Sequence, residues 1–142
     1  MITLDLASPN WTVSSGGLSQ NGNVVFAPTA AWSTVEYTYA GPINLVGATL
    51  TYLVNFDSSF KASGASIQVY AQALVAPWNG QWICWFDNSG IIAGTDQTIT
   101  CNGFTLADLN MTTTDSVKFG LQVSTSPTGT LTIKSATITP AP

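Results

Sequence analysis

The sequence predicts an all-β domain of the sandwich or barrel type, and two observations carry this prediction. Apolar and polar residues alternate with a period of two along the whole chain, in segments rich in β-branched and aromatic residues. Gly, Pro, Asn and Ser interrupt the alternation at short intervals, as turns do in antiparallel sheets. With 142 residues, 45% of them apolar, the chain suits one domain with one core. We assign residues 1–139 to this domain and 140–142 to the start of a linker.

Ten segments have strand character. In chain order they are Ile2–Leu6, Asn10–Ser14, Asn23–Ala27, Ser33–Tyr39, Ala48–Phe56, Ala65–Val75, Gly80–Phe86, Gln97–Asn102, Ser116–Ser124 and Gly129–Thr139. Between the eighth and the ninth of these strands we expect a single helical turn at Leu106–Leu109, which Thr105 can cap. No other segment has the apolar periodicity of a helix.

The charge of the chain excludes several classes of function. Three Lys, no Arg and seven acidic residues give a net charge of −4. Nucleic acid and anionic membranes require basic surfaces, so neither is an expected partner. The chain has no His, and its acidic residues lie mostly in turns without the carboxylate pair of a glycosidase, so we expect no enzyme. No cofactor is required, although a structural calcium near Asp5 and the carbonyls of the last strand stays open.

Cys84 and Cys101 are the two cysteines, and they lack the paired spacing of a zinc site. A disulfide between them is the favoured interpretation and indicates an oxidising, extracellular location, whereas two buried free thiols are the alternative. Strand alternation points Cys84 outward and Cys101 inward. A bulge or a strand end is needed to reconcile the two directions.

Three strands predict a polar sheet face that lacks the usual charges. In Ala65–Val75 and Ser116–Ser124 the apolar side chains share one side, and the other side carries mainly neutral amides. If both strands lie beside Ala48–Phe56, this face collects Gln68, Tyr70, Gln72, Lys118, Gln122 and Asn55, with Gly120 as its low point. An ordinary solvated face is the alternative, but such faces usually carry Lys and Glu.

Trp78, Trp82 and Trp85, three of the five tryptophans, cluster around an Asn-Gly turn dipeptide. The turn places Trp78 and Trp82 on the rim of the polar face. Alternation along the strand that follows turns Trp85 into the core, where Trp11 and Trp32 are also expected. For the two rim indoles, a core position or a dimer contact is the alternative.

Indole rings beside neutral amides suit a neutral polysaccharide. Pyranose rings present C–H faces that pack on indoles, and their hydroxyl edges need both donors and acceptors, which amides supply. Two indoles and a few hydrogen bonds correspond to a dissociation constant of about 10 µM before ordering costs. Binding is therefore expected to be weak and reversible.

Several segments together resemble a known family. These are Phe60–Ser63, Ile67–Gln72, Trp78 and Trp82 with Cys84, Cys101, and Gly129–Thr139. In order and spacing they are similar to the family 15 carbohydrate-binding modules, which bind xylan and are attached to bacterial xylanases. The resemblance extends from Leu53 to Thr139 and is weak before it. It implies a jelly-roll sandwich whose concave face holds a single xylan chain.

The resemblance also implies roles for individual residues. Trp82 corresponds to the second of two tryptophans that stack on sugars n and n+2, and Gln72 to a hydrogen-bonding glutamine. Trp78 corresponds to the first stacking tryptophan after a shift of one residue, because a proline occupies the ungapped position. Lys118 stands where the family has a glutamine, and Ser14 lies near the position of a family asparagine.

We therefore expect a secreted, monomeric and non-catalytic module that holds an attached glycoside hydrolase on the plant cell wall. It would bind xylan in an open groove through Trp78, Trp82, Gln72, Lys118, Gln122, Tyr70 and Asn55. Two alternatives stay open. One is another neutral β-glycan, of the cellulose or mixed-linkage type, and the other is a structural or adhesive sandwich that binds protein.

Overall fold

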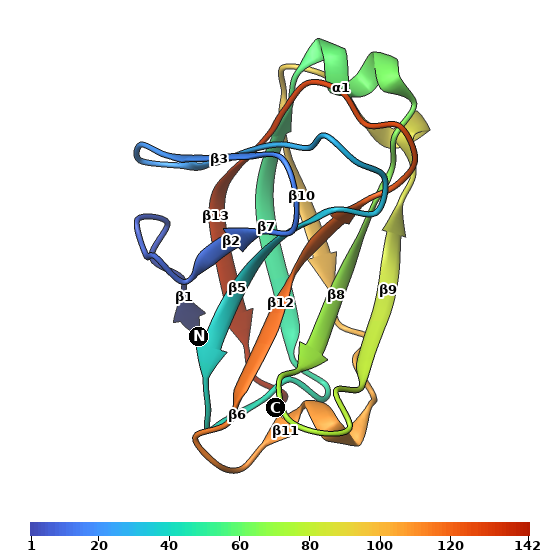
Figure 1. Cartoon of the computed structure of the whole chain (residues 1–142). Coiled ribbons are helices and arrows are strands. Elements are labelled where there is room, and N and C mark those ends of the chain that lie inside the picture. Colours follow the sequence, from blue (N-terminus) through green and yellow to red (C-terminus); the bar gives the residue numbers. More distant parts are fainter.

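Two antiparallel sheets packed face to face form the structure, a computed structural model that describes residues 1–142 (Figure 1). The nearer sheet in Figure 1 contains, in spatial order, β2 (Trp11–Val13), β5 (Thr34–Ala40), β12 (Ser116–Val123), β8 (Ile67–Ala73) and β9 (Gly80–Phe86). The six-stranded sheet behind it runs β10 (Asp96–Cys101), β7 (Thr49–Phe56), β13 (Leu131–Thr139), β4 (Val24–Ala27) and β3 (Gly17–Gln20), with β1 (Ile2–Thr3) paired to β13. The predicted β-sandwich is confirmed.

All ten expected strands form, and their ends differ from the expected ones by at most three residues. Three short strands were not expected: β3, and the pair β6 (Ile43–Asn44) and β11 (Asn110–Met111), which makes a small separate sheet. Inward side chains of both large sheets join one cluster of 31 buried apolar residues. Trp11 belongs to this core, as expected, and its indole N–H donates to the carbonyl of Asp5 at 3.0 Å.

The expectation of no helix beyond one turn is wrong, because α1 (Ser58–Ser63) follows β7. Asp57 caps it by accepting the backbone N–H of Phe60 at 2.8 Å, and Gly64 ends it with φ 78°. A helix of six residues is too short to show an apolar period, so only its caps could have revealed it.

The expected helical turn between β10 and β12 is present as the 3-10 turn η2 (Ala107–Leu109). Thr105 does not cap it, however, since no side chain caps this turn. The backbone N–H of Thr105 instead donates to the side-chain oxygen of Gln81 on β9. A second 3-10 turn, η1 (Asn88–Gly90), follows β9 directly.

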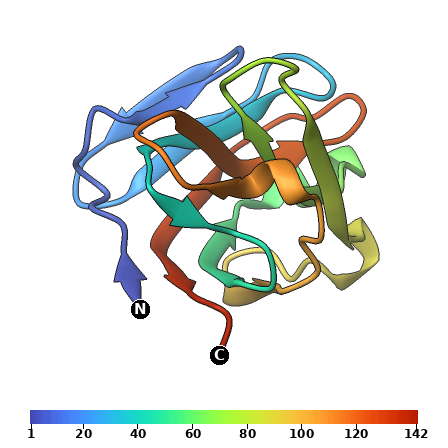
Figure 2. The same ribbon diagram turned by 90° about the horizontal axis from the view of Figure 1, so that it is seen from below.

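The two ends of the chain come together in the six-stranded sheet. β1 pairs with the end of β13, with Ile2 opposite Ile138. Seen from below, the N- and C-termini lie on the same side of the sandwich (Figure 2). None of the helical segments has the length and hydropathy needed to cross a bilayer.

Candidate functional site

The polar face expected from the sequence forms on the outer side of the five-stranded sheet. β8 and β12 lie side by side, with Gln72 opposite Lys118 and Gln68 opposite Gln122. Their inward neighbours are all buried, which leaves these four side chains on the solvent side. We call these four side chains, together with the outward side chains of the neighbouring strand β9, the polar face.

Trp82 is a half-exposed indole of the polar face, stacked on Tyr70. Its ring is stacked on that of Tyr70, with centroids 6.0 Å apart and planes inclined by 9°. The far edge of the indole lies over Gly80, where a Cβ would come within 2.9 Å of Trp82 Cη2. Trp82 is 44% exposed and Tyr70 only 1%. The expectation that Tyr70 offers its hydroxyl at the surface is wrong, because the indole covers it, and Tyr70 instead supports Trp82.

Trp78 stands in the connection between β8 and β9 and is 55% exposed. Its backbone has φ 64°, which is rare for a bulky side chain, and both of its backbone groups are held. Its N–H donates to the carbonyl of Val75 at 2.8 Å, and its carbonyl accepts from Gln72 Nε2 at 2.9 Å. Gln72 thereby fixes the loop that carries the indole, and its own Oε1 has no protein partner.

Gln68 and Gln122 form a chain of hydrogen bonds across the sheet. Gln68 Nε2 donates to Gln122 Oε1 at 2.7 Å, and Gln122 Nε2 donates to the carbonyl of Trp32 at 3.0 Å. Both polar groups of Gln122 are therefore occupied by the protein, whereas Gln68 keeps a free Oε1. The expectation of a core position for Trp32 is wrong, since its side chain is 49% exposed in the loop between β4 and β5.

Lys118 is the one cation of the polar face, and it is neutralised by its neighbour on β5. Its Nζ lies 3.7 Å from Glu36 Oε1, and Glu36 Oε2 accepts from the Thr34 hydroxyl at 2.9 Å. The lysine side chain is 28% exposed and that of the glutamate 11%. The pair leaves the face without net charge, while the ammonium group can still donate hydrogen bonds to a ligand.

Asn55 does not belong to the polar face. Its expected place there is wrong, because it required β7 to lie beside β8 and β12, whereas β7 pairs with β10 and β13 in the other sheet. There Asn55 Nδ2 donates to Asp96 Oδ1 at 2.9 Å, and Lys134 Nζ contacts the same oxygen at 2.9 Å. The Asn55 hydrogen bond, followed by that of Lys134, lowers the pKa of Asp96. Alternation identified the outward side of β7 correctly but could not tell to which sheet it belongs.

A bulge in β9 changes the direction of the residues after Trp82. Ile67 pairs with Phe86 and Val69 with Ile83, so one residue of β8, Gln68, faces two of β9. Cys84 has φ 59° and points inward to form the expected disulfide with Cys101. This resolves the conflict between the predicted directions of the two cysteines.

Trp85 is turned outward by the same bulge. Cys84 before it and Phe86 after it both pack toward the core, and Trp85 is 52% exposed. The expectation of a core position for Trp85 is therefore wrong. Its indole N–H lies 3.3 Å from Asp87 Oδ1. Hydrogen bonds from the side chain and backbone of Ser89, followed by that of Trp85, lower the pKa of Asp87.

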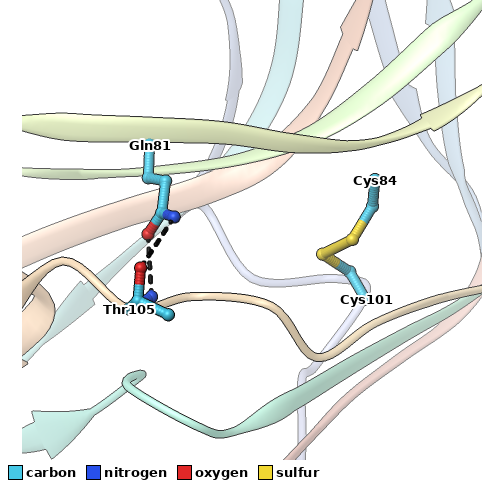
Figure 3. Close-up of a disulfide and its surroundings, with 4 residues drawn as sticks. All are labelled: Gln81, Cys84, Cys101 and Thr105. Atoms are coloured by element: carbon cyan, nitrogen blue, oxygen red, sulfur yellow. Dashed lines mark hydrogen bonds between the residues drawn. A yellow bond between two sulfur atoms is a disulfide. The ribbon is translucent and has the colours of Figure 1, made fainter.

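Two cross-links hold β9 to β10 and to the segment that follows it. Figure 3 shows Gln81 and Cys84 pointing from β9 toward the segment that carries Cys101 and Thr105. Gln81 Oε1 accepts the backbone N–H of Thr105 at 2.9 Å, and its Nε2 donates to the Thr105 hydroxyl at 3.2 Å. Sequence reasoning missed Gln81, although a polar residue at an inward position of a strand is the signal for such a link.

Other candidates for function lie away from the polar face. No group of three or more acidic, His or Cys side chains is placed to hold a metal ion. Asp5 Oδ1 accepts the N–H of Ala7, and Ser14 Oγ accepts the N–H of Thr34, so both act in local structure. A cavity of about 230 Å³ lies between the β8–β9 connection and residues 108–115, and no residue of the polar face lines it.

Comparison with known proteins relates the chain to carbohydrate-binding proteins. The family model described as "Carbohydrate binding domain (family 15)" matches residues 2–142. The endo-β-1,4-xylanase Xyn10C of Cellvibrio japonicus is 35% identical over 146 aligned positions, which cover 98% of this chain and 24% of that protein. The chain thus spans about a quarter of the length of this relative.

Solved structures agree with this relationship. A structure titled "xylan-binding module CBM15" matches with a TM-score of 0.86 and 33% identity, covering 97% of this chain and 94% of that one. A variant of xylanase 10C from Cellvibrio japonicus in complex with xylopentaose gives a TM-score of 0.85 and 32% identity, covering 97% and 28%. The family match over nearly the whole chain is conclusive, and the chain belongs to family 15 of the carbohydrate-binding domains.

Proposed function

We propose that this domain binds single chains of xylan, or of a related neutral β-1,4-glycan, along the polar face and performs no chemistry on them. The observation that carries the proposal is the Trp82 platform, an indole that is stacked on Tyr70 and is 44% exposed. A sugar ring can remove this surface from water without any rearrangement of the protein. Trp78, on the other side of the Asn79-Gly80 turn, offers a second exposed indole.

The hydrogen-bonding groups beside the indoles suit hydroxyls. Gln72 and Gln68 each use their amide N–H within the protein and keep an Oε1 that can accept from a sugar. Lys118 Nζ supplies donors at the centre of the sheet, and Glu36 cancels its charge. A neutral ligand fits such a face, because a charged ligand would meet no net countercharge.

The relatives support xylan as the ligand. The solved module at 33% identity is named a xylan-binding module, and the solved xylanase 10C variant holds xylopentaose. The resemblance noted in the sequence implies that Lys118 replaces a glutamine of the family. An ammonium group can replace the hydrogen-bond donor of an amide but not its acceptor. The preference for xylan over other β-glycans is therefore proposed for this chain and is not taken over from the family.

We also propose that the domain acts as a secreted targeting module joined to a glycoside hydrolase. In support, the chain covers only 24% of the relative, which is named an endo-β-1,4-xylanase. Both chain ends leave from the sheet opposite the polar face, so a domain attached at either end does not cover it. The disulfide suits an oxidising compartment outside the cytoplasm.

Isothermal titration with xylohexaose, cellohexaose and mannohexaose tests the proposal. We expect binding of xylohexaose with a dissociation constant on the order of 10 µM and weaker binding of the other two. Ile92→Ala is a matched control, because Ile92 is 60% exposed in the β9–β10 connection, away from the polar face. Absence of binding to all three sugars would favour an adhesive sandwich. Release of shorter oligosaccharides at stoichiometric protein would contradict a non-catalytic role.

A further inference from the structure

Two exposed indoles of this domain have no place in the binding site proposed above. Trp85 and Trp32 are 52% and 49% exposed, as much as Trp78 and Trp82. A single exposed apolar side chain is ordinary, but two half-exposed indoles that flank one polar surface are typical of an interaction site. Both lie at the end of the five-stranded sheet where β8 begins and β12 ends, the end nearest α1 (Figure 1).

Trp85 continues the row of Trp82 along β9. Outward positions of a strand recur about every 7 Å, and the bulge makes Trp85 the next outward residue after Trp82. The two indoles are three positions apart in sequence, so without the bulge they would face opposite sides of the sheet. The disulfide at Cys84 fixes the residue that causes this change of direction.

The backbone of Trp32 is held next to the polar face by Gln122. Its backbone adopts φ 62°, a costly conformation for a bulky side chain, and its two backbone groups are bonded to Gln122 of β12 and to Ser124 directly after that strand. Its N–H donates to the carbonyl of Ser124 at 3.3 Å, and its carbonyl accepts from Gln122 at 3.0 Å. Such a conformation persists only when the surroundings fix it, and here the fixing residue belongs to the polar face.

A polar network joins the two indoles. From Trp32 it runs through Gln122 to Gln68, which lies opposite the bulge that carries Trp85. A second path crosses the end of the sheet from Ser124 to Ser66, whose hydroxyl lies 3.5 Å from Asp87, the partner of the Trp85 indole N–H. The indoles therefore flank the same uncharged amides that continue the polar face.

We infer that Trp85 and Trp32 form a second sugar-stacking subsite at the α1 end of the polar face, so that the face holds a longer stretch of the same neutral β-glycan chain. This inference rests on the function proposed above. The ligand of this subsite is the same glycan chain, because the subsite continues the polar face: Trp82, Gln68 and Trp85 occupy adjacent outward positions. Amide acceptors between exposed indoles repeat the chemistry of the first subsite.

Chain-length dependence tests the inference. Affinities for xylotriose and xylohexaose are measured by titration for the unmodified domain, Trp85→Ala, Trp32→Ala and Trp82→Ala, with Ile92→Ala as control. We expect Trp85→Ala and Trp32→Ala to weaken xylohexaose binding about tenfold and to change xylotriose binding by less than about twofold. Trp82→Ala should weaken the binding of both sugars.

The outcomes separate this inference from the proposed function. Unchanged xylohexaose affinity in both variants overturns the second subsite, and the loss caused by Trp82→Ala then still supports sugar binding. An equal loss for both sugar lengths also overturns it, because Trp85 would then only shape the first subsite. If the unmodified domain binds neither sugar, the proposed function itself is wrong.

A second measurement keeps the test valid if an alanine variant does not fold. The indole N–H resonances of the unmodified domain are assigned with Trp85→Phe and Trp32→Phe, which retain an aromatic ring. We expect xylohexaose to shift the Trp85 and Trp32 signals and xylotriose to shift mainly those of Trp78 and Trp82. Absence of any shift at Trp85 and Trp32 with saturating xylohexaose overturns the inference.

Discussion

The sharpest prediction concerns Trp82→Ala, which removes the platform and leaves the strand in place. A tryptophan side chain has roughly 250 Å² of surface, so its 44% exposure corresponds to about 110 Å² that a sugar ring can cover. At ~25 cal/mol/Å², covering this area contributes on the order of 2.5 kcal/mol. Ordering of the ligand reduces the gain, and we expect a loss of about 2 kcal/mol, or roughly thirtyfold in affinity.

The cost to the fold should be smaller, because the other side of the indole contacts mainly Tyr70. A stacked aromatic pair contributes about 1 kcal/mol, which corresponds to a decrease of about 4 °C in Tm for a domain of this size. The assay combines isothermal titration of xylohexaose with thermal unfolding followed by circular dichroism. An affinity within twofold of the unmodified domain, in a variant that still folds, would refute the platform.

Three further predictions address the support of the polar face. Gly80→Ala places a Cβ within 2.9 Å of Trp82 Cη2, so the indole must move. We expect about a tenfold loss of xylohexaose affinity with a Tm change of only a few degrees. Unchanged affinity would contradict the close packing of Gly80 and Trp82. Reduction of the Cys84–Cys101 disulfide, or replacement of both cysteines by Ser, opens a loop with a sequence separation of 17. It should lower the free energy of unfolding, measured with denaturant, by about 3 kcal/mol. An unchanged unfolding midpoint would show that the bond adds no stability. The pKa of Asp87 lies below its usual 3.8, so the stability that its carboxylate contributes is complete above pH 3.8 and is lost as the pH falls through the lower pKa of the folded state. Asp87→Asn should therefore flatten the decrease of Tm in this acid range. A parallel decrease of Tm in both proteins would refute the assignment.

Strand positions could be predicted from the sequence because each strand buries one face. β7 and β8 alternate between inward buried residues and outward residues that are mostly polar, and this pattern predicts both their positions and the direction of their side chains. The pattern does not say which strands are neighbours. Alternation alone therefore puts Asn55 on the polar face, whereas the pairing of β7 with β10 and β13 places it on the other sheet.

The tryptophans show where alternation fails. Trp82 was placed correctly, because no irregularity separates it from the turn that precedes β9. Alternation puts Trp85 on the wrong side, because the bulge at Cys84 inserts one residue between Trp82 and Trp85. The sequence carried a warning in the opposing directions expected for Cys84 and Cys101, which a disulfide could not satisfy. The core position expected for Trp32 is wrong because its loop conformation, with φ 62°, depends on a hydrogen bond from Gln122, which is distant in the sequence.

The same reasoning explains the error at Tyr70. Its outward position was correct, but outward does not mean exposed when a neighbouring strand supplies a ring large enough to cover it. Tyr70 lies opposite Trp82 in the register of β8 and β9, and Gly80 has no side chain that would displace the indole. The phenol of Tyr70 is buried as a result. Pairing across strands therefore decides which groups of a sheet face a ligand can reach.

The bulge in β9 has a further consequence for how the domain behaves at high concentration. β9 is the last strand of its sheet, and a flat last strand is a template to which another molecule can add a strand of its own. At Cys84 the backbone leaves the extended conformation, so the row of free amide and carbonyl groups is broken. The irregularity that exposes an indole thus also protects the domain from self-association through its open sheet edge.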